Sequence, residues 1–100
     1  MANTYTNAKV DLTTTNVTTL YTCAALTTGI VKSILVSEDS GNADTITATL
    51  TNGTAVFSLF KTKAIGANTF PLVIQAGEIL KVNAATANRL HVVSSILEIT

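Results

Sequence analysis

The chain has 100 residues, of which 12% are charged and 47% hydrophobic, and its formal net charge at pH 7 is zero. This length favours a single domain over residues 1–100, and so few charges leave a surface poorly protected against association. Six scattered basic residues argue against nucleic acid as a partner, and no apolar run approaches the roughly 20 residues of a membrane span.

The N-terminal segment MANTYTNAK has no basic start followed by an apolar core, so we expect no signal peptide. Residues 1–7 carry no strand pattern of their own and are interpreted as an arm that docks on a neighbouring protein. Within this arm, Asn3, Thr4 and Tyr5 are the predicted docking residues. The single cysteine, Cys23, has apolar neighbours and is predicted to be a buried thiol in a protein made in a reducing cytoplasm.

Alternating apolar and polar residues, rich in threonine, indicate strands rather than helices. Turn residues divide the chain into eight short segments of this kind. Together they predict an all-β fold, a β-sandwich or jelly roll of about eight antiparallel strands. The predicted strands are 8–12, 17–23, 29–37, 44–51, 54–61, 70–74, 79–84 and 89–99.

A hairpin is the clearest element, because Asn52-Gly53 is a strong signal for a two-residue type I′ turn. Pairing outward from this turn predicts one apolar face built from three pairs, Leu50 with Ala55, Ala48 with Phe57, and Ile46 with Leu59. Val56 and Phe60 then lie on the opposite face. They are either single exposed hydrophobic residues or contacts with another subunit.

The last strand is apolar on both faces, which favours a central strand or one covered by a neighbour. Leu90, Val92 and Ile96 alternate with Val93, Leu97 and Ile99. We therefore predict subunit contacts at Val56, Phe60, Leu97 and Ile99.

No set of residues indicates catalysis. His91 is the only histidine and is interpreted as a packed or interface residue. Neither it nor Cys23 has the spacing of a zinc site, and Glu38, Asp39 and Asp44 are interpreted as a solvated acidic turn. We expect a non-enzymatic protein with no cofactor and no metal.

Three segments, VKSILVS (31–37), PLVIQAGEILKV (71–82) and ANRLHVVSSILEI (87–99), together with the alternating hairpin, resemble small virion structural proteins of tailed bacteriophages. The resemblance spans residues 30–99 and includes capsid decoration (cement) proteins and related head or tail accessory subunits. It implies a homo-oligomer, expected to be a trimer, on the capsid surface of the virion. The major capsid protein is the implied partner, and Asn3, Thr4 and Tyr5 of the arm are the expected capsid-docking residues.

The expected function is therefore to bind the outer capsid lattice and to stabilise contacts between major capsid subunits. Two alternatives remain open. One is a structural adaptor in the tail, neck or a head fibre, and the other is a receptor- or glycan-binding module.

Overall fold

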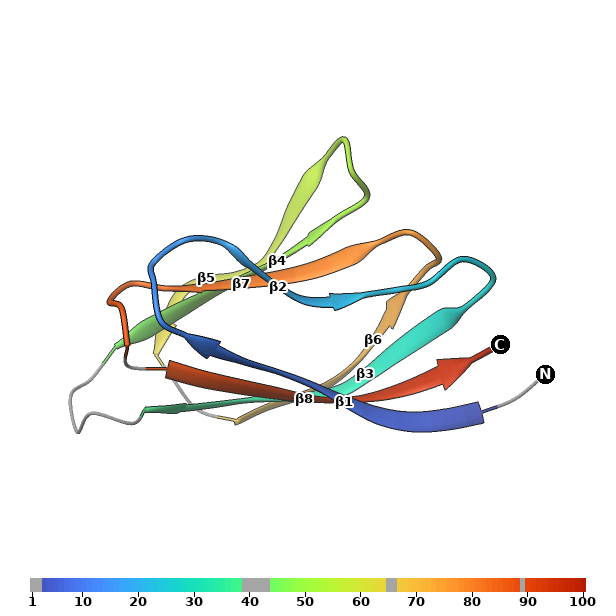
Figure 1. Cartoon of the computed structure of the whole chain (residues 1–100), viewed down its shortest axis with the longest axis horizontal. Helices are drawn as coiled ribbons and strands as arrows, with labels where there is room; N and C mark the ends of the chain where they lie inside the picture. Colours follow the sequence, from blue (N-terminus) through green and yellow to red (C-terminus); the bar gives the residue numbers. More distant parts are fainter. Residues whose placement is uncertain (1–2, 39–43, 65–66, 89) are drawn as a thin grey trace.

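Two antiparallel sheets pack face to face in the computed structural model (Figure 1). The structure describes residues 3–38, 44–64, 67–88 and 90–100, with their side chains except those of residues 60–64 and 67–71. These ranges form eight strands: β1 (Asn3–Leu12), β2 (Thr18–Thr22), β3 (Thr28–Glu38), β4 (Thr45–Thr51), β5 (Val56–Ala64), β6 (Ala67–Ile74), β7 (Ile79–Ala84) and β8 (Leu90–Ile99).

The strand order is that of a jelly roll. The first sheet has the order β1-β8-β3-β6 and the second has the order β2-β7-β4-β5. Most consecutive strands therefore lie in different sheets, and only β4 and β5 form a hairpin within one sheet. The predicted all-β jelly-roll sandwich is confirmed.

The first strand is longer than predicted, because it begins at Asn3 rather than at residue 8. Residues 3–7 pair with residues 95–99 of β8 in the same chain. The Thr and Tyr side chains of this segment suit a strand even though they show no apolar alternation. Residues 1–2 lie outside the described part, and the docking of the segment on a neighbour stays a prediction.

The core lies between the sheets and is built from side chains that alternate along the strands. Cys23 is buried, as predicted, and its Sγ lies 3.2 Å from the carbonyl oxygen of Thr27. Ser94 is the polar exception on the inner face of β8, and its hydroxyl donates to the carbonyl oxygen of Ser33 at 2.9 Å. The buried hydrophobic side chains are Leu12, Leu20, Tyr21, Cys23, Val31, Ile34, Val36, Ile46, Ala48, Ile74, Leu80, Val82, Ala84, Leu90, Val92 and Ile96.

The predicted register of the hairpin is wrong. Thr51 pairs with Val56 and Leu50 with Phe57, so the loop has four residues, 52–55, rather than two. Among the described residues, Gly53 has a positive φ of 98° and Asn52 does not, whereas a type I′ turn needs both.

The side chain of Asn52 explains the longer loop. Its Oδ1 accepts hydrogen bonds from the backbone N–H groups of Thr54 at 3.0 Å and Ala55 at 2.9 Å. The hydroxyl of Thr51 donates to the carbonyl oxygen of Ala55 at 2.8 Å. An asparagine that closes a turn with its own side chain competes with the two-residue turn.

The hairpin tip projects away from the sandwich (Figure 1). Phe57 was predicted to lie on the core face with Ile46 and Ala48, but its side chain is 55% exposed. The shifted register moves Phe57 toward the tip, where the other sheet does not cover it.

Leu80 is fully buried between the sheets, whereas Leu26 at the β2–β3 turn is 92% exposed. We expect Leu80→Ala to lower the free energy of unfolding by about 2–5 kcal/mol, because it leaves a cavity in the core. Leu26→Ala, the matched control, should change it by less than about 0.5 kcal/mol. Urea unfolding measures both, and equal effects would contradict this placement of the core.

Candidate functional site

The outer surface of the first sheet carries an apolar row that crosses all four strands. Tyr5 of β1 is opposite Leu97 of β8, Leu97 is opposite Ile30 of β3, and Ile30 is opposite Val73 of β6. Their neighbours Ile96, Val31 and Ile74 are buried, so these four side chains point away from the core. Tyr5 is 78% and Val73 is 53% exposed, while Leu97 and Ile30 are half-buried.

A second row with apolar character lies four residues further along β1. Lys9 is opposite Val93, and Val93 is opposite Leu35, with both hydrophobic side chains exposed. A polar row lies between the two, formed by Asn7, Ser95 and Ser33. We call this banded surface the outer face; it comprises Tyr5, Leu97, Ile30, Val73, Asn7, Ser95, Ser33, Lys9, Val93 and Leu35.

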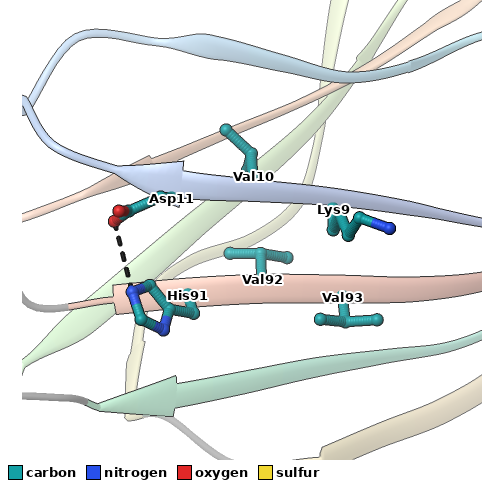
Figure 2. A pocket seen from close by; sticks show the side chains of 6 residues that line it. All are labelled: Lys9, Val10, Asp11, His91, Val92 and Val93. Atoms are coloured by element: carbon teal, nitrogen blue, oxygen red, sulfur yellow. Dashed lines mark ion pairs between the residues drawn. The ribbon is translucent and has the colours of Figure 1, made fainter.

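A shallow depression of about 340 Å³ lies over the seam between β1 and β8 (Figure 2). Asp11 reaches across the seam to His91, and its Oδ1 lies 3.3 Å from Nε2 of the imidazole. The other lining residues are Lys9, Val10, Val92 and Val93.

An imidazole and carboxylate catalyse acyl transfer only beside a nucleophile, and the lining residues include no Ser, Thr or Cys. Both side chains of the pair are substantially exposed, so the pair contributes little to stability.

A second depression of about 320 Å³ continues along the same seam. It is lined by Tyr5, Thr6, Asn7, Lys32, Ser95 and Ile96. Lys32 supplies a cation beside an aromatic ring and neutral polar groups. Both depressions therefore belong to one surface, suited to shallow contact with another macromolecule rather than to enclosing a small substrate.

A hydrogen bond beneath one end of the outer face joins the two sheets. The hydroxyl of Tyr21 on β2 donates to Oε2 of Glu98 on β8 at 2.6 Å. Burial raises the pKa of the Tyr21 phenol well above its ordinary value of 10.0, and the hydrogen bond to Glu98 raises it further. Gly29 makes room for this ring, because a Cβ there would lie 3.0 Å from its Cε2 and Oη atoms.

The structure merges two predicted sites into one. The predicted docking residues Asn3 and Tyr5 lie opposite the predicted subunit contacts Ile99 and Leu97. Thr4 is adjacent to both docking residues and is exposed. Val56, 67% exposed, lies on the second sheet, away from this surface. The side chain of Phe60 lies outside the described part.

Sequence reasoning missed Ile30, Leu35 and Val73 as outer-face residues. Their apolar character was visible, but a register shift in β3 decides that Leu35 points to the same side as Ile30 and Val73. The pairing of β3 with β8 shifts between Val31 and Ser33, so Lys32 has no partner of its own. Strict alternation would place Val31 and Leu35 on one face, and the shift places them on opposite faces.

Within the described residues, no three His, Cys, Asp or Glu side chains are grouped as metal ligands would be. The same residues include no helix that is long and apolar enough to cross a membrane.

The chain is similar in structure to a pentameric capsid protein isolated from metagenomic phage sequences. The TM-score is 0.50 at 17% identity, and the match covers 93% of this chain and 59% of that chain. A second structure of a pentameric capsid protein from metagenomic phage sequences matches with a TM-score of 0.47 and 18% identity, over 93% of this chain and 60% of that one. The chain thus spans less than two thirds of these proteins, and at this identity the first likeness shows a shared fold. No protein-family model and no curated protein sequence matches the chain.

We expect Tyr21→Phe to flatten the loss of stability at high pH. The folded phenol has a raised pKa, so its contribution is complete below about pH 10 and is lost as pH rises, because only the unfolded chain ionises there. The free energy of unfolding should fall by about 1.4 kcal/mol per pH unit more in the wild type than in Tyr21→Phe. Urea unfolding at several pH values measures this, with the exposed Tyr5→Phe as the matched control. If the free energy of unfolding fell with pH as steeply in Tyr21→Phe as in the wild type, the raised pKa of the Tyr21 phenol would be contradicted.

Proposed function

We propose that the chain is a non-enzymatic structural protein of a phage virion that decorates the capsid surface and stabilises contacts between major capsid subunits. The observation that carries this proposal is the apolar row Tyr5–Leu97–Ile30–Val73 across an otherwise complete sandwich. Contiguous exposed apolar surface on a small domain marks a site of macromolecular contact. The low charge of the chain, 12%, favours a surface that is covered in use.

Two independent likenesses support a virion role. The sequence resembles small virion structural proteins of tailed bacteriophages over residues 30–99, and the fold is shared with a phage capsid protein. Neither likeness indicates which surface of the chain would bind the capsid. The choice of surface rests on the outer face, where Tyr5, expected to dock on the capsid, lies opposite Leu97, expected to contact another subunit.

The size of the outer face suits docking by many copies. Ten-residue strands are about 33 Å long, and four strands span about 19 Å, which gives roughly 600 Å². A standard interface buries about 800 Å² on each partner. One copy would therefore bind modestly, and repetition over a lattice would supply avidity.

A homo-oligomer fits the same role, and our expectation is a trimer. The pentameric state of the similar capsid protein supplies the alternative. Val56 and Phe60 of β5 are the proposed contacts on the second sheet. The mass of the isolated protein in sedimentation distinguishes three copies from five.

We expect Val73→Asp to weaken binding to capsids about tenfold or more, because it places a charge within the apolar row. Val17→Asp is the matched control, since Val17 is 60% exposed and lies before β2, outside the outer face. Co-sedimentation with capsids that lack the protein measures binding. Equal binding by both variants would contradict docking through the outer face. Binding confined to tail or neck particles would support the adaptor role instead.

A further inference from the structure

The four edge strands of the two sheets differ in how well they are protected against pairing with another strand. Edge strands are normally protected by shortness, bulges, proline or charge. β2 has five residues and a register shift, β6 contains Pro71 beside a shift, and the β4–β5 pairing shifts twice. β1 has ten residues, no proline, and an unbroken register with β8. Its two charges, Lys9 and Asp11, lie in its C-terminal half, so residues 3–8 are the least protected edge.

The N-terminal half of β1 is also uncovered on both faces. Every side chain from Asn3 to Asn7 is exposed, including Thr4 and Thr6, which alternate with the outer-face residues. The C-terminal end is different. Leu12 is buried, and its carbonyl oxygen accepts a hydrogen bond from Asn88 N–H at 3.0 Å. The open edge therefore runs from Asn3 toward Asp11 and stops before Leu12.

We propose that this edge pairs antiparallel with β1 of a second copy of the chain, about a two-fold axis at Asn7. In this register Asn7 faces its own copy, and Tyr5 faces Lys9 of the second copy. The axis is perpendicular to the sheet, so a continuous eight-stranded sheet forms with both outer faces on the same side.

Charge and the pairing of Tyr5 with Lys9 select this register. A two-fold axis at any residue of β1 sets odd positions opposite odd positions, so the outer-face side chains of both copies lie on one side. Among these centres, Asn7 is the one that sets Tyr5 opposite Lys9. Centring on Lys9 or on Asp11 would set like charges directly opposite each other, which is destabilising. Centring on Asn7 sets Asn3 opposite Asp11 of the second copy and separates the two copies of Lys9 by about 13 Å along the strands.

The same register makes the outer face continuous. The row Val73–Ile30–Leu97–Tyr5 of one copy would meet the row Lys9–Val93–Leu35 of the other. The aromatic ring of Tyr5 would lie beside an ammonium group, a favourable contact. This self-complementarity favours a second copy over an unrelated strand as the occupant. The inference does not depend on binding to a capsid. A trimer or pentamer whose subunits also pair in this way would contain six or ten copies.

Cysteine cross-linking tests the register. Directly opposite residues have Cα atoms about 4.5–5.5 Å apart, within disulfide range, so Asn7→Cys should give a covalent dimer under mild oxidation. Asn3→Cys is the matched control, because its two copies would lie about 27 Å apart. The buried Cys23 is present in both variants. No dimer with Asn7→Cys, or an equal yield with Asn3→Cys, would overturn the register.

A charge substitution tests the contact without cross-linking. Asn7→Asp would place two carboxylates opposite each other and lower the affinity between copies about two- to fivefold, an effect that salt reduces. Asn16→Asp makes the same charge change in the exposed β1–β2 loop and should leave the affinity unchanged. Sedimentation over a concentration series measures both. A monomeric wild type, or the same affinity in both variants, would overturn pairing through β1.

Discussion

The structure depends on β8, which pairs antiparallel with β1 in an unbroken register on one side and with β3, through one register shift, on the other. Alternation along this one strand sends Leu90, Val92 and Ile96 into the core and Val93 and Leu97 to the outer face. A strand that is apolar on both faces supplies core and contact surface at once. Any slip of its register by one residue would exchange the two sets.

The register shift at Lys32 is the second constraint on the outer face. It lets Val31 and Ile34 both point into the core while Ile30 and Leu35 point outward. Ser94 lies opposite this region and donates its hydroxyl to the carbonyl oxygen of Ser33 at 2.9 Å, so a buried polar group is satisfied where the ladder is disturbed. The shifted pairing of β3 with β8 thus determines which apolar side chains form the rows on the outer face.

The strands and the sandwich fold could be predicted from the sequence, because apolar alternation and turn residues are local signals. The sequence predicted the hairpin but not its register, since the side chain of Asn52 makes a longer turn than its type I′ signal indicated. It predicted Tyr5 and Leu97 separately as contact residues, and both predictions await a test. That they form one surface depends on the pairing of the first strand with the last, which no local pattern specifies.

The central claim is that the outer face lies against a capsid lattice in many copies. Quantitative mass spectrometry of purified particles, with the chain measured against the major capsid protein, tests it most directly. The account predicts a ratio of the same order as the capsid protein. A ratio near one in a hundred would contradict lattice-wide decoration and place the protein at the tail or neck.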